Sequence, residues 1–348
     1  MSRYQSGPRH QFQVWDSHLP PEFYGRSRDD VGLLVIENAS GTYSSARFAE
    51  LPEFLKRGDI LVFNDSALVP SSLPVFDVSR RQQGWLNVGT SRLNGKILVE
   101  PRPKSFNRML TEEGNVLAVI GNGREIELSR RHSTFSRFFW ADARMGEDEL
   151  REMLGRYGAP LTYDHIPFKL PLSFYSTVVS RVPGSAEFPS ASRPFSRRVM
   201  ASLRQKGILQ AYLTLHCNLS PLEPDEFSSS PFLPDEYYEI PEATATAAEE
   251  ARDSGGRVIA VGTSVVRALE SSYRGRIVPG SGTTDLFIRP GRRPKSVDGL
   301  LTGLHDPESS HVEMISAFLD DSLLRSAYTT ASAIGFQWHE FGDLSLIA

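Results

Sequence analysis

The chain has 348 residues with a formal net charge of −4, and 40% of them are hydrophobic, which is typical of a globular protein of about two domains. The single cysteine, Cys217, excludes an internal disulfide and a cysteine-rich zinc site, and the net charge provides no overall attraction for nucleic acid. Residues 1–21 lack the apolar centre of a signal peptide and no apolar run could cross a bilayer, so we expect a cytoplasmic protein.

The first part of the chain predicts strands of an α/β sheet. Residues 32–36 and 59–63 are apolar runs typical of buried strands, and 48–54 predicts a helix between them. The second strand runs directly into Asn64 and Asp65. Open α/β sheets bind their ligands at the carboxyl ends of their strands, so both side chains are candidate ligand contacts. The same pair is equally typical of a turn without any function.

The pattern changes between residues 70 and 140 to short alternating segments at 86–88, 96–99, 116–120, 125–128 and 135–140. Asn122-Gly123 between two of them indicates a hairpin. This region predicts an antiparallel β-barrel or sandwich, followed by a helix over 150–157. We therefore predict a discontinuous α/β domain that carries the site, residues 1–68 and 159–348, and an inserted β-barrel domain, residues 69–158.

The α/β pattern resumes after a proline-rich passage. Helices are predicted at 195–206, 242–254, 312–319 and 323–334, and strands at 208–215, 257–261, 285–288 and 297–302. Residues 341–347 are predicted to be a tail. Helices that alternate with strands indicate an α/β sheet.

Residues 255–272 combine an apolar strand, a Gly-Thr-Ser turn and a helix. The first N–H groups of such a helix can bind an anion. Ser264 is expected to cap these N–H groups, and Arg267 can add a cation for a carboxylate or phosphate. The alternative, a junction without a ligand, remains open.

Polar residues follow several of the predicted strands, namely Asn64, Asp65, His216, Thr263, Ser264, Arg267 and His305. At one edge of a sheet they would suit acid/base chemistry on a small polar ligand. No pattern for a metal site, a Walker motif or a dinucleotide-binding glycine turn is present. We therefore expect neither a metal nor a nucleotide cofactor.

The chain also resembles a known family, the S-adenosylmethionine:tRNA ribosyltransferase-isomerases of queuosine synthesis. The similar motifs keep their order along the chain and lie at 58–66 (Gly-Asp-Ile-Leu-Val-Phe-Asn-Asp-Ser), 175–178, 214–216 (Thr-Leu-His), 236–239, 257–271, 284–291 and 341–343 (Phe-Gly-Asp). The resemblance implies an α/β domain with an inserted β-barrel. It also implies S-adenosylmethionine as the ribosyl donor, with adenine and methionine released as the ribosyl group moves onto a deazaguanine of tRNA and rearranges.

Site residues follow from the motifs and the strand ends together. We expect His216, Asp65 and His305 to be catalytic, with S-adenosylmethionine as the substrate. The expected substrate-binding residues are Asn64, Tyr175, Thr177, Glu236, Thr263, Ser264, Arg267 and Asp343.

Several motifs depart from the family pattern. The segment 189–195 lacks the family's histidine, and Glu308 stands where the family has lysine. A polyanion such as tRNA needs cations, so these changes disfavour tRNA as a partner. We expect an enzyme that cleaves or rearranges S-adenosylmethionine with a small acceptor or none. The alternatives are the tRNA-modifying transferase-isomerase itself and a non-catalytic binding protein.

Overall fold

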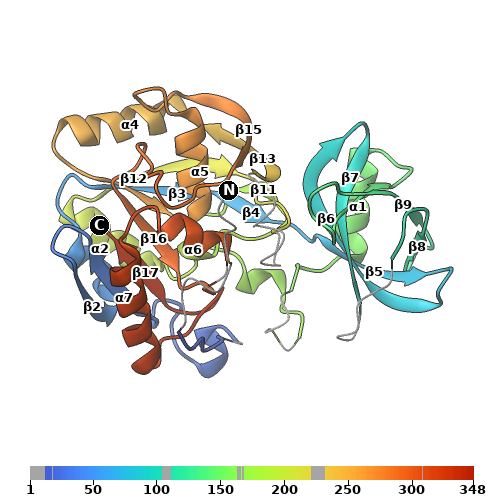
Figure 1. The fold of residues 1–348 in the computed structure, drawn as a ribbon, viewed down its shortest axis with the longest axis horizontal. Helices are drawn as coiled ribbons and strands as arrows, with labels where there is room; N and C mark the ends of the chain where they lie inside the picture. Colours follow the sequence, from blue (N-terminus) through green and yellow to red (C-terminus); the bar gives the residue numbers. More distant parts are fainter. Residues whose placement is uncertain are drawn as a thin grey trace, which may run out of the picture.

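The computed structural model describes residues 12–17, 19–103, 111–162, 166, 168–220, 232–307 and 309–348. An α/β part and a smaller barrel part lie side by side along the longest axis of the molecule (Figure 1). The predicted fold class, an α/β sheet domain with an inserted antiparallel β-barrel, is confirmed.

A nine-stranded sheet runs through the described α/β part. In spatial order its strands are β15 (Gly280–Leu286), β13 (Phe232–Ile240), β12 (Leu209–Leu215), β3 (Ile60–Asn64), β14 (Val258–Val261), β16 (Gly299–Gly303), β17 (Leu344–Ile347), β1 (Gly32–Glu37) and β2 (Thr42–Arg47). The four central strands β12, β3, β14 and β16 are parallel. Their carboxyl ends therefore lie along one edge of the sheet.

The strand β3 shows why these apolar runs form central strands. All five of its residues are buried, because successive side chains point to opposite faces and both faces are covered. Ile60 and Val62 belong to the apolar cluster on one face, whereas Leu61 and Phe63 belong to the cluster on the other.

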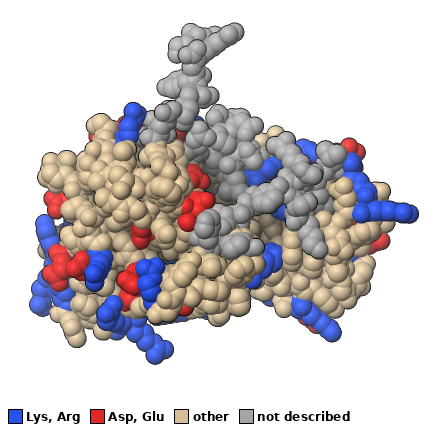
Figure 2. Space-filling model, turned by 90° about the horizontal axis from the view of Figure 1, so that it is seen from below, with Lys and Arg blue, Asp and Glu red and all other residues tan. Residues whose placement is uncertain are grey.

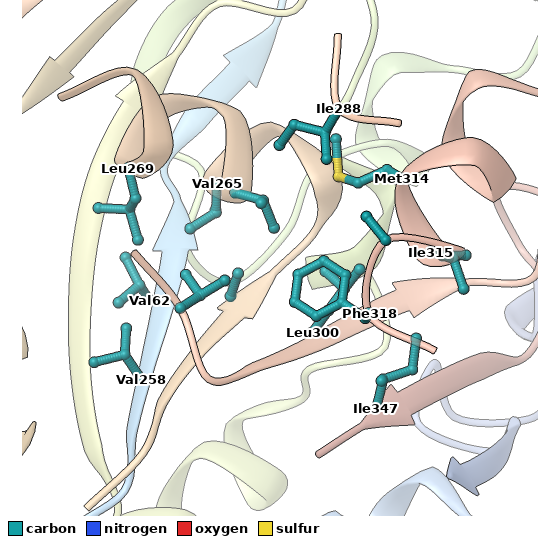
Figure 3. Packing of buried hydrophobic residues seen from close by; sticks show 14 of the residues in the cluster. Val62, Val258, Val265, Leu269, Ile288, Leu300, Met314, Ile315, Phe318 and Ile347 are labelled. Atoms are coloured by element: carbon teal, nitrogen blue, oxygen red, sulfur yellow. The ribbon is translucent and has the colours of Figure 1, made fainter. Parts of the chain in front are cut away.

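Helices cover both faces of the sheet. One face carries α4 (Glu242–Asp253), α5 (Thr263–Ser272), α6 (Ser310–Ile315) and α7 (Asp321–Ala333); the other carries α2 (Arg197–Lys206) and the 3-10 helix η2 (Phe48–Phe54). Figure 3 shows Val265 and Leu269 of α5, with Met314 and Ile315 of α6, packed over the strand residues Val62, Val258, Leu300 and Ile347. Short 3-10 helices also occur as η1 (Pro21–Tyr24), η3 (Leu172–Phe174) and η4 (Ser190–Ser192).

The barrel is closed, with the strand order β10-β7-β6-β5-β8-β9. Its strands are β5 (Ser72–Asp77), β6 (Gln82–Leu93), β7 (Lys96–Pro103), β8 (Val116–Val119), β9 (Glu125–Arg131) and β10 (Phe139–Asp142). Leu150 and Met153 of α1 (Glu147–Tyr157) join the apolar cluster of the barrel. These elements lie within 72–157, and the predicted domain limits at 69 and 158 stay a prediction.

A short two-stranded sheet lies where the chain enters the barrel. It consists of β4 (Ser66–Leu68), which leads from β3 toward the barrel, and β11 (Val182–Ser185), which pairs with β4 in parallel and so runs in the same direction. Every helix within the described ranges is too short or too polar to cross a membrane.

Some elements differ from the sequence-based predictions. The tail at 341–347 contributes β17, which closes the gap between β16 and β1. Residues 48–54 form a 3-10 helix, because Pro52 inside it has no N–H to donate. The strand predicted at 285–288 is β15, which begins earlier, at Gly280.

Candidate functional site

Polar residues follow the carboxyl ends of four parallel strands along one edge of the sheet. Asn64 ends β3, His216 follows β12, Thr263 follows β14 and His305 follows β16. Asp343 precedes the antiparallel β17 and so lies at the same edge. The strand connectivity thus produces the grouping that the sequence predicts.

The side chain of Asn64 forms hydrogen bonds that connect three elements. Its Oδ1 accepts hydrogen bonds from the backbone N–H groups of Ser66 and Leu215, both at 3.0 Å. Its Nδ2 donates to Leu215 O at 2.8 Å and to Ser264 Oγ at 3.3 Å. The amide is only 1% exposed. Asn64 therefore fixes the turn after β3, the end of β12 and the start of α5 relative to one another.

Asp65 is the next residue after Asn64, and its carboxylate is half-buried. Thr214 Oγ1 donates to its Oδ1 at 2.7 Å. Burial raises the pKa of Asp65, while the Thr214 hydrogen bond and the charges of Arg181 and His216 oppose the rise. A carboxylate beside an imidazole is a candidate general base, and a raised pKa makes it a stronger one.

Two residues, Tyr237 and Gly184, lie against the His216 ring. Tyr237 stacks on it with ring centroids 5.8 Å apart and an interplanar angle of 26°. Gly184 also approaches the ring. A Cβ at this position would come within 2.5 to 2.6 Å of ring atoms, so only glycine fits there. Ser66 Oγ lies 2.7 Å from His216 Nδ1. Burial lowers the pKa of His216, and the Asp65 charge opposes that shift.

The amino terminus of α5 begins at Gly262, not at a Ser264 cap. Gly262 is the N-cap residue, with φ of 98°, and no side chain caps the helix. Ser264 lies inside the first turn and accepts from Asn64 instead. The expectation that Ser264 caps the helix is wrong, because the strand reaches the helix through a backbone conformation that favours glycine.

Arg267 holds a carboxylate of its own chain. Its Nη1 donates to Glu236 Oε2, and its Nε donates to Leu286 O at 3.0 Å. Both Arg267 and Glu236 are buried, and Asn218 N–H donates to Glu236 Oε1 at 2.9 Å. Burial raises the pKa of Glu236, and the Arg267 charge opposes this shift. The role of these two residues in substrate binding stays a prediction.

His305 forms a stacked pair with His311 of α6. The ring centroids are 4.2 Å apart with an interplanar angle of 8°, and His305 Nε2 lies 2.9 Å from Thr302 Oγ1. Burial, followed by the charges of His311 and His339, brings the pKa of His305 well below its usual value. Burial and the Arg267 charge lower the pKa of His311 to about 4.

The remaining predicted residues have contacts that support the fold. Tyr175 packs against Phe188 and Phe341, and burial raises its pKa to about 12. Thr177 forms a hydrogen-bonded turn with Ser180. Asp343 accepts from the backbone N–H groups of Gly32 and Gln337. Their expected role in substrate binding is untested by these contacts.

The structure adds residues that the sequence analysis missed. Ser66, Gly184 and Ser185 contact His216 or its hydrogen-bond partner, and Arg181 lies close enough to Asp65 to lower its pKa. Ser66 directly follows the Asn64-Asp65 pair, so its position was available as a clue. Gly184 and Ser185 follow the last barrel strand, β10, by about forty residues, and no local pattern distinguishes them. Glu308 lies outside the described residues.

The described ranges contain no group of three or more His, Cys, Asp and Glu side chains that could hold a metal ion. The chemistry open to the grouped residues is acid/base chemistry by Asp65 and His216, with hydrogen-bond donors at the start of α5.

Comparisons with known proteins cover nearly the whole chain. The family described as "Queuosine biosynthesis protein" matches residues 14–347. An S-adenosylmethionine:tRNA ribosyltransferase-isomerase of Thermus thermophilus is 34% identical, over 96% of this chain and 99% of its own length. The one from Caldanaerobacter subterraneus is 31% identical, over 90% of this chain and 92% of its own. A crystal structure of S-adenosylmethionine tRNA ribosyltransferase from Thermotoga maritima has a similar fold, with a TM-score of 0.50, 24% identity, and coverage of 97% and 100% of the two chains.

These relatives correct the expectation that tRNA is disfavoured as a partner, because their names state that they act on tRNA. They also give no support to a diverged enzyme with a small acceptor or none. The net charge of −4 is a sum over 348 residues and does not describe local charge. Figure 2 shows Lys and Arg side chains spread among acidic ones over the face seen there. With a family match over 14–347 and relatives above 30% identity, the chain belongs to the queuosine biosynthesis protein family.

Proposed function

We propose that this protein is an S-adenosylmethionine:tRNA ribosyltransferase-isomerase, which transfers the ribosyl part of S-adenosylmethionine to tRNA. The observation that carries the proposal is that relatives with this name are 31% and 34% identical over 90% and 96% of the chain. The residues at the carboxyl edge of the sheet suit this chemistry. The non-catalytic alternative provides no reason for a half-buried Asp65 beside His216.

The start of α5 suits the carboxylate of the methionine part. The first N–H groups of a helix lack partners within the helix and point toward an anion together with the positive end of the helix dipole. Arg267 already forms an ion pair with Glu236, so we assign the carboxylate to the backbone of Thr263 and Ser264 rather than to this guanidinium.

Asp65 suits the role of general base. Proton removal from the carbon next to the sulfonium needs a base whose pKa is close to the working pH. Burial raises the pKa of Asp65 toward that range. The carboxylate adjoins His216, which can orient a polar atom of the substrate.

The experiment is to incubate the protein with S-adenosylmethionine, with and without tRNA that carries the unmodified deazaguanine. Mass spectrometry then follows released adenine and methionine and the mass of the tRNA nucleoside. We expect release that depends on tRNA, together with a ribosyl-derived mass gain. Fully modified tRNA is the control acceptor and should give neither product.

Two results would contradict the proposal. Release of adenine without tRNA would indicate an enzyme that cleaves S-adenosylmethionine alone. Binding of S-adenosylmethionine with no release under any condition would indicate a binding protein.

A further inference from the structure

A chain of hydrogen bonds leads from the backbone to the His216 ring. The N–H of Cys217 donates to Ser185 Oγ at 2.9 Å. Ser185 Oγ and Ser66 Oγ are 2.6 Å apart, and Ser66 Oγ is 2.7 Å from His216 Nδ1. Both serines are fully buried, at 0% exposure. Each hydroxyl has one hydrogen to donate, so the direction of the chain can be worked out by counting donors.

One direction satisfies every hydrogen. The backbone N–H of Cys217 can only donate, so Ser185 Oγ accepts from it, and in this direction Ser185 gives its own hydrogen to Ser66. Ser66 then accepts from Ser185 and donates to Nδ1 of His216. In this direction Nδ1 is an acceptor and carries no hydrogen, so the neutral ring carries its hydrogen on Nε2.

The opposite direction leaves a buried hydrogen poorly placed. If Nδ1 carried the hydrogen, Ser66 would accept from His216 and donate to Ser185. Ser185 Oγ would then accept twice, and its own hydrogen would be left to the Cys217 sulfur, its remaining side-chain partner among the described residues, which is a weak acceptor. Buried donors without a good acceptor are disfavoured. Because Ser66 Oγ is a better acceptor for the Ser185 hydrogen than the Cys217 sulfur, the direction from Ser185 through Ser66 to His216 is favoured.

The ring is also fixed in orientation. Gly184 and Tyr237 pack against the ring, and the contact with Ser66 Oγ holds Nδ1 in place. His216 is only partly exposed, and among the described residues Nε2 has no hydrogen-bond partner. The charged neighbours are Asp65, whose carboxylate acts on the ring, and Arg181, which acts on Asp65.

We propose that Ser66 and Ser185 are positioning residues that hold neutral His216 with its hydrogen on Nε2, so that His216 acts as a hydrogen-bond donor to the substrate. The catalytic part of this inference rests on the proposed function, whereas the tautomer does not. His216 then orients or polarises a substrate atom, and the task of proton removal falls to Asp65. Asp65 is then the base and His216 the hydrogen-bond donor, two roles that the sequence leaves unassigned.

The tautomer can be measured on the whole protein without a substrate. Nitrogen-15 NMR of histidine-labelled protein separates protonated from unprotonated ring nitrogens, and the His216→Gln variant assigns the signals. We expect an unprotonated Nδ1 and a protonated Nε2 at pH 7.5 in the unmodified protein. A protonated Nδ1 would overturn the proposal, whatever the variants show.

Variants then test the two serines. Ser66→Ala removes the donor, and Ser185→Ala removes the group that sets its direction without touching the ring. In both variants we expect a mixture of tautomers and a higher pKa for His216, because the neutral ring loses the hydrogen bond that Ser66 donates to Nδ1 or the group that directs it. Ser66→Thr keeps the hydroxyl and should restore the original tautomer. Unchanged nitrogen-15 chemical shifts of His216 and an unchanged His216 pKa in Ser66→Ala would overturn the proposal. If that variant does not fold, the same result in Ser185→Ala would overturn it.

Matched controls separate this role from a general loss of structure. Ser71→Ala removes another buried serine, whose Oγ donates to Ala186 O at 2.8 Å, and Cys217→Ala removes the weak sulfur acceptor. Both should keep the tautomer. In turnover, Ser66→Ala should lower kcat roughly tenfold, the effect of one hydrogen bond, with KM for S-adenosylmethionine nearly unchanged. The expected tautomer without ribosyl transfer would refute the proposed function only. Transfer with a protonated Nδ1 would refute the positioning role only.

Discussion

At the residue scale, the buried pair of Arg267 and Glu236 carries a large share of local stability. Removing one partner of a buried ion pair leaves the other charged and unpaired, which costs about 3–5 kcal/mol. We therefore expect Arg267→Ala to lower the free energy of unfolding by that amount in urea denaturation. The double variant Arg267→Met/Glu236→Leu should recover most of the loss. An Arg267→Ala protein of normal stability that no longer binds S-adenosylmethionine would instead support the role expected from sequence.

Asp65 offers a kinetic prediction at the same scale. Asp65→Asn keeps the shape and an acceptor for Thr214 but removes the base, so we expect kcat to fall by about 10²–10⁴-fold. A base acts when deprotonated, and burial raises its pKa. Activity of the unmodified enzyme should therefore rise with pH through that raised pKa, and this acidic limb should disappear in the variant. Asp253→Asn, on an exposed carboxylate, is the control. A pH–rate profile with the limb intact in Asp65→Asn would assign the base elsewhere.

At the element scale, Gly262 determines how α5 begins. Its φ of 98° is unfavourable for any residue with a Cβ, at about 1–2 kcal/mol. We expect Gly262→Ala to lower the free energy of unfolding by that amount and to weaken S-adenosylmethionine binding in calorimetry. Gly146 is the N-cap residue of α1 with φ of −75° and open space around it, so Gly146→Ala introduces no backbone strain and should cost less than Gly262→Ala. Equal effects of the two substitutions would remove the backbone argument.

The helix α6 is tied to pH through the His305–His311 pair. The folded protein holds both pKa values below the unfolded value of about 6.5. The unfolded chain therefore binds more protons below pH 6.5, and stability is full above that pH and falls toward pH 4. Glu340 opposes the shift at His311, and His339 is paired with Asp16. Urea denaturation at pH 7, 6 and 5 should show this decline, and His311→Gln should reduce it. The same slope in both proteins would contradict the assignment.

The element scale also separates what the sequence predicts from what it cannot. The strands β1 and β3 follow from continuous apolar runs, and the barrel follows from short alternating segments bounded by turns. The strand β2, Thr-Tyr-Ser-Ser-Ala-Arg, is an edge strand with largely exposed side chains, so its sequence has no apolar pattern to detect. The strand β17 has only four residues, and its partners β16 and β1 are distant in sequence.

The site shows the same division. Strand ends predict that Asn64, His216 and Thr263 share an edge, because parallel strands align their carboxyl ends. Other features depend on tertiary packing. They are the hydrogen bonds of the buried Asn64, the ion pair of Arg267 and the contact of Gly184 with His216. Residues far apart in sequence make these contacts, so no local pattern contains them.

At the scale of the whole molecule, Asn218 joins the barrel to the sheet part. Its Oδ1 accepts from Thr90 N–H at 2.9 Å, and its Nδ2 donates to Ser91 Oγ and to Asp235 O. We expect Asn218→Ala to loosen this junction, so that calorimetry resolves separate transitions for the two parts. Asn122→Ala, on an exposed hairpin of the barrel, should keep the unmodified profile. A single unshifted transition in Asn218→Ala would contradict the prediction.

The position of the barrel within the chain also orders events during synthesis. The central strand β3 pairs with β12 and β14, so Ile60 can pair with Leu209 and Val258 only after these residues have left the ribosome. Among the described residues the barrel strands pair with one another within 72–142, apart from a single bridge from Ser72 to Ala159. All of these strands are made during that interval. Non-local pairings form slowly and leave apolar surface exposed in the meantime. A nascent chain therefore carries all the barrel strands while the apolar residues 60–63 of β3 still lack their partners. We expect this strand to be the segment that most needs chaperone protection until β12 and β14 are made.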